Sequence, residues 1–339
     1  MNRRQCLKLL GVGGLGIFFT GLTLRPLFAQ TGKNKLKCFS KTLPLMNTYV
    51  EITVWDKSYS KACEATEKAF CKIKKLISIF NRFDPNSYVS WLNTYGKLKD
   101  LPPDLYNLLK ISEYVYKITG YKFDITVLPV LELTSYYLEK QNSIPDKKLI
   151  EEVLECVGFK YVSFDKNRVN FLRKGVMVTF DGIAKGYIVD KAAEELKRYS
   201  ISYGLINAGG DIKAIGSDRD KPWIVGIQDP ESPDKLIQKI ALIDLAIATS
   251  GSYENFFDPQ KIHYHIIDKK TGFSPLMVKS CSVIAKSTAL ADGLATGLFV
   301  KAPENAIRLA DGLKGIEAEV ITKGNRIFRS KGWKNFLIS

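Results

Sequence analysis

The spacing of apolar residues in the first half of the chain changes from alternation to helical periodicity. Residues 43–55 (LPLMNTYVEITVW) alternate between apolar and polar side chains, which predicts a β-strand. Residues 59–80 and 103–118 carry apolar side chains at helical spacing, which predicts two amphipathic helices. The turn at residues 84–87 (DPNS) is expected to cap a short helix over residues 89–92. Two further elements are expected: a helix over residues 146–157 and a hairpin that pairs residues 161–164 with 168–171.

The second half of the chain has the pattern of short strands interrupted by helices at about residues 187–198 and 288–300. Strands joined mostly as meanders, with helices packed on one side, predict an α+β architecture rather than a regular β-α-β alternation. No internal repeat or low-complexity segment is visible. The expected strands cover residues 176–180, 203–206, 211–215, 223–227, 238–242, 246–249, 263–267 and 281–285.

The N-terminal residues have the pattern of an export signal. The pair Arg3-Arg4 precedes the uncharged run Leu9–Leu24, and Ala29 is a small residue at the expected cleavage point. This order predicts a signal peptide of the twin-arginine type at residues 1–29, with an uncleaved membrane anchor as the alternative. Residues 30–339 are then expected in the periplasm or on the extracytoplasmic face of the inner membrane.

The charge balance is basic, while the composition is that of an ordinary globular protein. The chain carries 50 Lys and Arg against 35 Asp and Glu, and its formal net charge of +15 becomes +11 without the four positive charges of residues 1–29. A basic surface suits anionic partners such as nucleotides or membrane headgroups. The lysines are scattered and no nucleic-acid-binding module is recognisable, so no nucleic-acid partner is expected. The six cysteines have no CxxC spacing, which favours neither a disulfide framework nor a zinc cluster.

Residues 178–190 (VTFDGIAKGYIVD) combine an expected strand, a glycine-bearing turn and the start of a helix. Gly182 and Gly186 lie on either side of Lys185, a composition suited to holding a phosphate group. A Walker loop places Lys directly after its last Gly and follows it with Ser or Thr, whereas here the order is Lys-Gly-Tyr. The turn is therefore a phosphate-binding candidate outside the Walker class.

Hard oxygen donors recur on the expected helix near the C-terminus. Asp292 and Thr296 are four residues apart, so a carboxylate and a hydroxyl share one helix face. Two such oxygens can hold Mg²⁺, which takes its remaining ligands from water and substrate phosphates. The alternative is that Asp292 bonds a neighbouring amide and Thr296 fills a gap beside the helix.

Other polar residues cluster at expected strand ends. His263 and His265 would project from one face of a strand, and a single His acting as proton shuttle or phosphate donor is favoured over a two-His metal site. The paired glycines of residues 207–211 (NAGGD) permit either close approach to a ligand or a plain turn. The segment 248–253 (ATSGSY) is open to the same two interpretations.

Taken in their order along the chain, eight motifs closely resemble the ApbE family of FAD:protein FMN transferases over about residues 40–330. They are Met46-Asn-Thr-Tyr-Val-Glu-Ile-Thr, Phe83-Asp-Pro-Asn-Ser with Ser90-Trp-Leu-Asn, Phe123-Asp-Ile-Thr-Val-Leu-Pro, Asp181-Gly-Ile-Ala-Lys-Gly-Tyr, Ile206-Asn-Ala-Gly-Gly-Asp-Ile, Ala248-Thr-Ser-Gly-Ser-Tyr, His265-Ile-Ile-Asp with Thr271-Gly272, and Ala291-Asp-Gly-Leu-Ala-Thr.

The resemblance implies a fold and a reaction. The implied fold is T-fold-like (tunnelling-fold), an antiparallel sheet with packed helices and an added α/β portion, here forming one FAD-binding domain over residues 30–339. The implied reaction cleaves the pyrophosphate of FAD with Mg²⁺ and joins FMN to a Thr or Ser hydroxyl of a target flavoprotein, which releases AMP. The implied target is a redox-pump type of subunit with a Ser/Thr-Gly-Ala-Thr motif, and association with the inner membrane is a further option.

The resemblance also implies roles for individual residues. Asp292 and Thr296 would be side-chain Mg²⁺ ligands, joined by the backbone carbonyl of Gly182. His265 would handle the proton of the acceptor hydroxyl, while Asp181 is a metal ligand, an acid–base group or only a turn cap. The implied FAD contacts are Met46, Phe83, Lys122, Phe123, Asp124, Thr179, Lys185, Ile266 and Ala295.

The chain departs from the family pattern at several positions. Asn47 stands at a family glycine and either reaches a ligand or sits in a turn. Thr179 replaces the usual Asp, and Asp181 occupies a position often held by Gly, as if the acidic group had moved along the chain. The pair Lys269-Lys270 replaces a common Pro-Arg, for which no change of chemistry is expected.

Two other functions compete with transfer. One is an Mg²⁺-dependent FAD pyrophosphatase that uses water as the acceptor and yields FMN and AMP. The other is a non-catalytic periplasmic flavin carrier, against which the retention of Asp292, Thr296 and Lys185 argues because storage needs no metal ligands.

Overall fold

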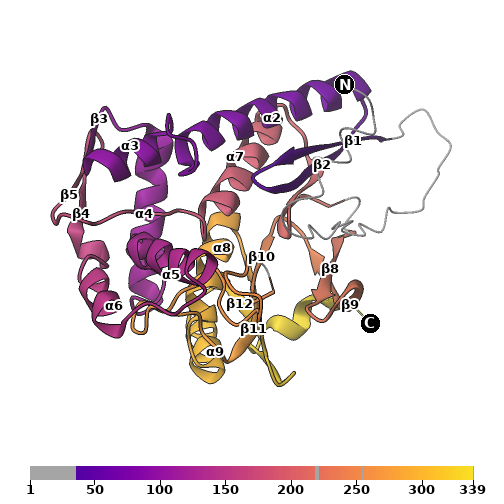
Figure 1. Cartoon of the computed structure of the whole chain (residues 1–339). Coiled ribbons are helices and arrows are strands. Elements are labelled where there is room, and N and C mark those ends of the chain that lie inside the picture. Colours follow the sequence, from indigo (N-terminus) through magenta and orange to yellow (C-terminus); the bar gives the residue numbers. More distant parts are fainter. Residues whose placement is uncertain (1–35, 218–220, 254, 339) are drawn as a thin grey trace, which may run out of the picture.

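An antiparallel sheet of eight strands organises the fold, with helices packed against it (Figure 1). All neighbouring strands in this sheet run antiparallel, so the predicted α+β class is confirmed. The strands, in their order across the sheet, are β1 (Lys37–Leu45), β2 (Thr48–Asp56), β6 (Tyr203–Ala208), β7 (Asp211–Ile215), β10 (Ala246–Gly251), β11 (Val278–Ala285), β12 (Glu317–Thr322) and β13 (Ile327–Arg329).

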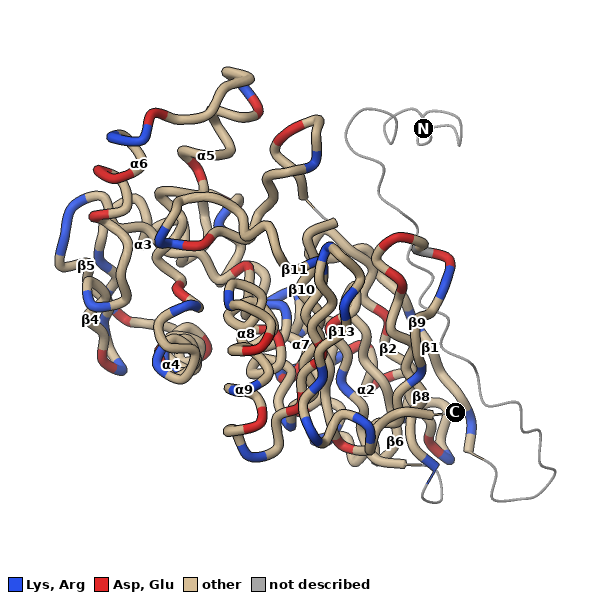
Figure 2. The backbone as a smooth tube through the Cα atoms, turned by 90° about the horizontal axis from the view of Figure 1, so that it is seen from below, with Lys and Arg blue, Asp and Glu red and all other residues tan. Residues whose placement is uncertain are grey.

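The structure is a computed structural model that describes residues 36–217, 221–253 and 255–338. The expected signal peptide at residues 1–29 lies outside these ranges. Within them, no helix combines the length and the apolar character needed to cross a bilayer. Lys and Arg are interspersed with Asp and Glu along the described chain (Figure 2), as the scattered lysines of the sequence predict.

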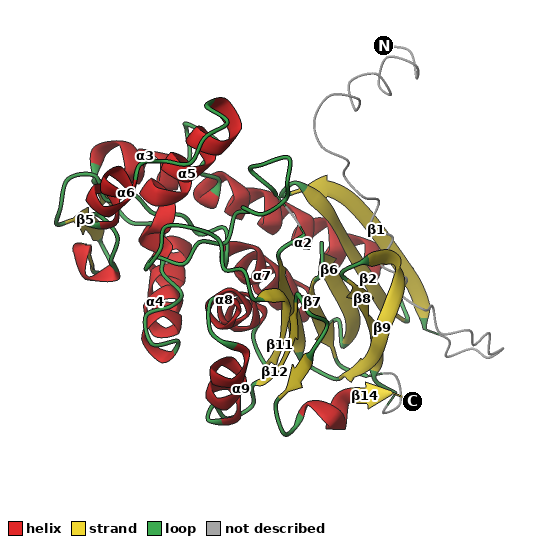
Figure 3. Ribbon diagram, turned by 60° about the horizontal axis from the view of Figure 1, so that its bottom comes forward, coloured by secondary structure: helices red, strands yellow, loops and turns green. Residues whose placement is uncertain are grey.

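The helices fall into two groups (Figure 3). Helices α2, α7 and α8 lie along the large sheet, whereas α3 to α6 gather on the side away from it. The helices are α2 (Tyr59–Phe80), α3 (Tyr88–Tyr95), α4 (Pro103–Ile118), α5 (Leu128–Lys140), α6 (Lys147–Leu154), α7 (Ala184–Arg198), α8 (Thr288–Phe299) and α9 (Pro303–Asp311), with short 3₁₀ turns at Ile125–Val127, Phe159–Tyr161 and Trp333–Phe336.

Two small sheets complete the architecture. The first has the order β14-β9-β8 and packs its apolar side chains, including Trp223 and Ile240, against Leu205 and Ile247 of the large sheet. Because side chains alternate along a strand, the other face of the large sheet is left for α7 and α8. The strands of the small sheets are β8 (Trp223–Asp229), β9 (Ser232–Leu242) and β14 (Leu337–Ile338) in the first, and β3 (Lys97–Lys99), β5 (Arg168–Phe171) and β4 (Val162–Phe164) in the second.

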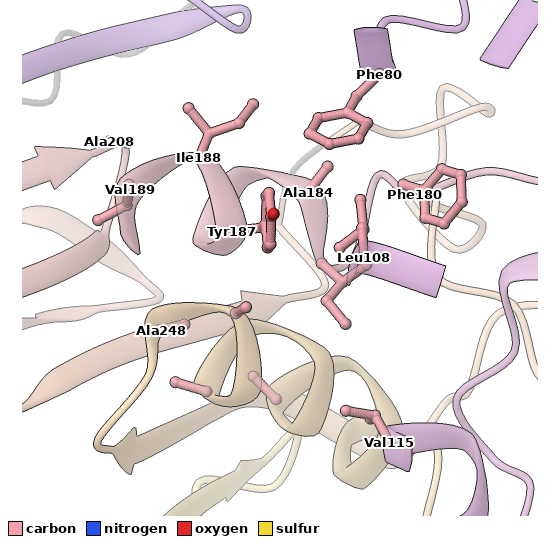
Figure 4. Close-up of a cluster of buried hydrophobic side chains, with 14 of the residues drawn as sticks. Phe80, Leu108, Val115, Phe180, Ala184, Tyr187, Ile188, Val189, Ala208 and Ala248 are labelled. Atoms are coloured by element: carbon pink, nitrogen blue, oxygen red, sulfur yellow. The ribbon is translucent and has the colours of Figure 1, made fainter. Parts of the chain in front are cut away.

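The large hydrophobic core joins the helices to one another (Figure 4). Phe80, at the end of α2, lies 5.7 Å from the ring of Tyr187 on α7 and 6.3 Å from the ring of Phe180. Leu108 and Val115 of α4 are fully buried in the same core. This packing fixes residues 180–187, the glycine-bearing turn, against both α2 and α4.

Several predicted elements are confirmed closely. Helices α2 and α4 have the predicted bounds, and α3 begins after Ser87, whose hydroxyl accepts a hydrogen bond from the Ser90 N–H. The hairpin of β4 and β5 is present. Helices α7 and α8 correspond to the helices expected at about residues 187–198 and 288–300. Helix α7 begins at Ala184 rather than near residue 187. The helix expected over residues 146–157 is shorter, since α6 ends at Leu154.

The single strand expected over residues 43–55 was wrong, because this segment is a hairpin. Met46 and Asn47 form a two-residue turn between β1 and β2, with φ angles of 56° and 55°. Left-handed backbone at both turn positions is typical of hairpin turns whose twist matches that of the strands. Asn tolerates this conformation better than other residues with a Cβ. Asn47 therefore serves the turn, which explains how it can replace a family glycine.

Two other expected strands were also wrong. Residues 176–180 are extended but pair with no strand, because their backbone bonds to Asn93 and Ile125 instead: Val178 exchanges two hydrogen bonds with the Asn93 side chain. Residues 263–267 belong to a loop that has only isolated bridges at Tyr264 and Asp268. His263 and His265 therefore do not share a strand face.

Candidate functional site

Helices α7 and α8 approach each other closely at Gly186. The Gly186 N–H donates a 2.9 Å hydrogen bond to Oδ2 of Asp292. A Cβ at Gly186 would lie 2.4 Å from the carbonyl oxygen of Thr288 and 2.8 Å from Cβ of Asp292. Only glycine fits this approach without moving a helix backbone. The second glycine of the turn is therefore required by helix packing.

Gly182, the first glycine of the turn, contacts α8 at Thr296, four residues after Asp292. The Thr296 hydroxyl lies 3.4 Å from the carbonyl oxygen of Gly182 and 3.2 Å from the hydroxyl of Ser250. A Cβ at Gly182 would lie 2.9 Å from Oγ1 of Thr296. The structure thus brings together the predicted Gly182, Asp292 and Thr296 from two parts of the chain.

These oxygens fit a hard divalent cation. Carboxylate, hydroxyl and carbonyl oxygens are the donors that Mg²⁺ prefers, and one carboxylate with a few neutral oxygens is a usual protein share of its ligands. Asp292 is only 7% exposed, and Oδ2 is used by the Gly186 N–H. Among the described residues, no group of three or more His, Cys, Asp or Glu is placed to hold a metal, so a soft or histidine-rich centre has no support there.

The site concentrates negative charge in a buried place. Burial raises the pKa of Asp292, the nearby Asp211 carboxylate raises it further, and Lys185 opposes both effects. The Lys185 ammonium lies 3.4 Å from Oδ2 of Asp211. The buried carboxylates of Asp292 and Asp211 share one ammonium, that of Lys185, and this arrangement favours binding of a further cation.

The β1–β2 turn closes one side of this site. A Cβ at Gly209, whose φ is +59°, would lie 2.4 Å from Oγ1 of Thr48. The paired glycines before Asp211 thus permit the close approach of Thr48, the residue after the turn. This contact brings the β1–β2 turn, which carries the predicted FAD contact Met46, next to the β6–β7 turn.

Asp181 makes a contact that the sequence did not predict. Its Oδ2 accepts a 2.8 Å hydrogen bond from Nε of Arg82, and its own N–H donates to the hydroxyl of Thr179 at 3.1 Å. Thr179 is buried, while the Asp181 side chain is 46% exposed. The partly exposed carboxylate is therefore engaged in an ion pair with Arg82.

The segment Lys122–Asp124 is joined to the loop that carries the histidines. Lys122 pairs with Asp268 at 2.9 Å, and Lys269 pairs with Asp124 at 2.8 Å. Asp268 and Lys269 are adjacent in the loop, and Lys122 and Asp124 directly precede the 3₁₀ turn at Ile125–Val127. The two ion pairs therefore fix the loop against the start of this turn. Lys269, which stands at a family proline, is thus a half-buried partner of the buried Asp124. Phe123 packs on α8, where a Cβ at Gly297 would lie 3.1 Å from its own Cβ.

The remaining predicted residues differ in their exposure. Ile266 and Ala295 are buried, and His265 is half-buried between Tyr264 and Ile266. The Tyr264 N–H donates to the Ser274 hydroxyl at 2.8 Å, which anchors the loop beside His265. His263 packs at 5.4 Å from the Phe273 ring. The loop thus gives the two histidines different surroundings.

Sequence reasoning missed several partners in this site. Arg82, Asp268 and Ser250 each contact a predicted residue, but they lie far from it along the chain. Asp211 was visible as the acidic residue after a Gly-Gly pair, although its pairing with Lys185 was not predicted. Only the charge of Arg82, directly before Phe83, could have marked it in advance.

Comparison with known proteins assigns the family. The model of the ApbE family matches residues 46–320. An FAD:protein FMN transferase of Haemophilus influenzae is 31% identical over 311 residues, covering 87% of this chain and 89% of that protein. One of Treponema pallidum is 26% identical, with 89% of each chain covered. The chain belongs to the ApbE family.

Solved structures agree with the fold. The ApbE protein of Thermotoga maritima matches with a TM-score of 0.81 and 29% identity, covering 89% of this chain and all of that one. The flavin transferase ApbE of Vibrio cholerae matches with a TM-score of 0.78 at 24% identity over 89% of this chain. The antiparallel sheet and its packed helices are therefore the family architecture.

Proposed function

We propose that this chain is an FAD:protein FMN transferase. It transfers FMN from FAD to a Thr or Ser hydroxyl of a target flavoprotein and releases AMP. One observation carries the proposal: the Gly182 carbonyl, the Thr296 hydroxyl and the Asp292 carboxylate meet beside Lys185. Family membership supplies the reaction class, and this set of groups supplies what cleavage of a pyrophosphate requires.

The three oxygens would hold Mg²⁺. Bound there, Mg²⁺ would neutralise charge on the pyrophosphate oxygens as the phosphoryl group is transferred. Gly182 contributes its backbone carbonyl, so that ligand is fixed by the turn and not by a mobile side chain. Lys185 is paired with Asp211 at 3.4 Å, and its ammonium is the basic group available to a phosphate oxygen at this turn.

The reaction balances as a single displacement. The acceptor oxygen forms a bond to the phosphorus of the FMN half, and the bond from that phosphorus to the bridging oxygen breaks. AMP leaves with the bridging oxygen, while the acceptor hydroxyl loses its proton. We assign the proton to His265, because the pairing of Asp181 with Arg82 leaves that carboxylate less suited to the role.

We also propose a location, which rests on the pattern of residues 1–29, and a partner, which rests on the family resemblance. The signal of residues 1–29 supports export by the twin-arginine route, and the acceptor is then an extracytoplasmic flavoprotein of the redox-pump type with a Ser/Thr-Gly-Ala-Thr motif. The basic charge of the chain supports association with the anionic inner membrane. A fusion of residues 1–29 to a reporter tests export: secretion that depends on Arg3-Arg4 is expected, and a cytoplasmic reporter would contradict it.

The reaction itself is tested by product analysis. Purified protein is mixed with FAD and Mg²⁺, and free FMN and AMP are measured with and without an acceptor domain. The proposal predicts that the acceptor strongly raises AMP and that free FMN does not rise with it. Equal release of FMN and AMP, unchanged by the acceptor, would instead establish the pyrophosphatase.

Two variants connect the result to the site. Thr296→Val removes a hydroxyl and keeps the shape, so AMP release is expected to fall at least tenfold. Thr66→Val is the control, because Thr66 is also a helical threonine and, within the described part of the chain, its hydroxyl bonds to the Ala62 carbonyl of its own helix. Equal activity of the two variants would remove the role of Thr296.

A further inference from the structure

Three contacts join residues 178–181, which precede α7, to α2, to α3 and to the turn between these two helices. In the interior, Asn93 exchanges hydrogen bonds with both backbone groups of Val178. In the core, the rings of Phe80 and Phe180 lie 6.3 Å apart (Figure 4). At the surface, Arg82 donates to Asp181. Residues 178–181 are therefore held at three points, and the outermost contact is the ion pair.

Arg82 is held in place on several sides. Its carbonyl accepts a 2.9 Å hydrogen bond from the Ser90 hydroxyl, its Nε donates to Asp181 at 2.8 Å, and a terminal nitrogen lies 3.8 Å from Glu132 of α5. Its side chain is only 15% exposed. A guanidinium fixed in this way presents a rigid plane to its neighbours.

That plane covers one face of the Phe83 ring. The guanidinium carbon of Arg82 lies 4.0 Å from the ring centroid, a close cation–π contact. The Phe83 side chain is nevertheless 66% exposed. A large aromatic ring that is fixed on one side and open to solvent on the other is a stacking surface for a planar ligand.

We infer that Arg82 and Asp181 form a positioning pair, which fixes the Phe83 ring so that it stacks on the flavin ring of FAD. The inference rests on the proposed function. The acceptor protein must reach the FMN phosphate and then leave with FMN attached, so the flavin half belongs at the open side of the site. Phe83 and Asp181 are exposed to solvent, whereas Lys185 is half-buried and Asp211 is buried. Asp181, which stands where the family often has glycine, thus acts through Arg82 and not on the phosphate.

The test separates the two halves of FAD. Affinities for FAD and for ADP, which lacks the flavin, are measured by calorimetry in EDTA so that FAD is not consumed. Arg82→Gln and Asp181→Asn are each expected to lower FAD affinity about tenfold, the usual size of one aromatic stacking contact. ADP affinity is expected to stay within about twofold, and the double variant to bind FAD no worse than either single variant.

A control and the contrary outcomes complete the experiment. Asp165→Asn breaks an exposed ion pair with Arg168 at a distant hairpin and is expected to change neither affinity. Equal loss of FAD and ADP affinity in the Arg82 and Asp181 variants would show general damage to the site and overturn the inference. Unchanged FAD affinity in these variants would overturn the positioning pair but not the proposed function. A wild-type protein without FAD affinity would overturn both.

Discussion

The backbone N–H of Gly186 donates a 2.9 Å hydrogen bond to Oδ2 of Asp292, and this contact sets the spacing of α7 and α8. The same turn of α7 carries Lys185, and the same face of α8 carries Thr296. One hydrogen bond between helices therefore positions an ammonium, a carboxylate and a hydroxyl relative to one another. The geometry of the site therefore depends on the local backbone of residues 182–186.

Gly186→Ala is expected to destabilise the fold by about 3 kcal/mol, because its Cβ would lie 2.4 Å from a backbone oxygen and force the helices apart. Urea unfolding followed by circular dichroism measures the change. Gly312→Ala is the control, since Gly312 has ordinary φ and a Cβ there would come no closer than 3.4 Å to its neighbours; a change within about 1 kcal/mol is expected. Equal effects at the two positions would contradict the close helix approach.

Asp292→Asn is expected to abolish AMP release without lowering the stability of the metal-free protein. Asn keeps an oxygen for the Gly186 N–H but removes the charge. Because burial and Asp211 raise the pKa of Asp292, the ionised carboxylate costs the metal-free fold free energy that the amide does not. Activity assays and thermal unfolding in EDTA measure both effects. Full activity in this variant would remove Asp292 from the site.

Asn47→Gly and Asn47→Ala separate a turn from a ligand contact. The φ of 55° favours Gly and penalises Ala, so Ala is expected to destabilise the protein by about 1 kcal/mol and Gly to be neutral or stabilising. FAD affinity should be unchanged in the Gly variant, since Asn47 serves the turn. Loss of FAD affinity in Asn47→Gly would show that the side chain contacts the ligand.

Cys281 is expected to make the stability of the protein depend on alkaline pH. Burial raises the pKa of the Cys281 thiol and Glu319 adds to it, so the folded chain keeps a proton that the unfolded chain loses above about pH 8.5. The fold therefore loses stability as the pH rises, by about 2 kcal/mol from this group at about pH 10. Cys281→Ala should lack this loss when the free energy of unfolding is measured both below about pH 8.5 and at about pH 10. Val283→Ala, a neighbouring core truncation without a titrating group, should keep it, and parallel curves for the two variants would contradict the assignment.

The sequence predicted best those elements that have local end signals. The bounds of α2 and α4 were predicted from regular apolar spacing, and the structure shows the end signals that agree with them: Ser58 caps α2, and Pro103 is the first residue of α4. The hairpin at Met46-Asn47 was missed because alternation continues through a two-residue turn, and no Gly marks it. Residues 176–180 have strand-like composition, but only the fold reveals that Asn93 takes the place of a neighbouring strand.

The same limit applies to the site. The four-residue spacing of Asp292 and Thr296 was enough to place both on one helix face, and the family motif joined Gly182 to them. By contrast, Asp268 and Lys269 lie more than a hundred residues from the partners they bind, Lys122 and Asp124. A single sequence contains no signal for such pairs.

The central claim is tested most directly by weighing an acceptor. An acceptor domain with a Ser/Thr-Gly-Ala-Thr motif is incubated with this protein, FAD and Mg²⁺, and its intact mass is measured. Transfer predicts a mass increase equal to covalently bound FMN, which disappears when the acceptor Thr is changed to Val and when Thr296→Val replaces the wild-type enzyme. An acceptor of unchanged mass, while FAD is consumed to FMN and AMP, would contradict the account.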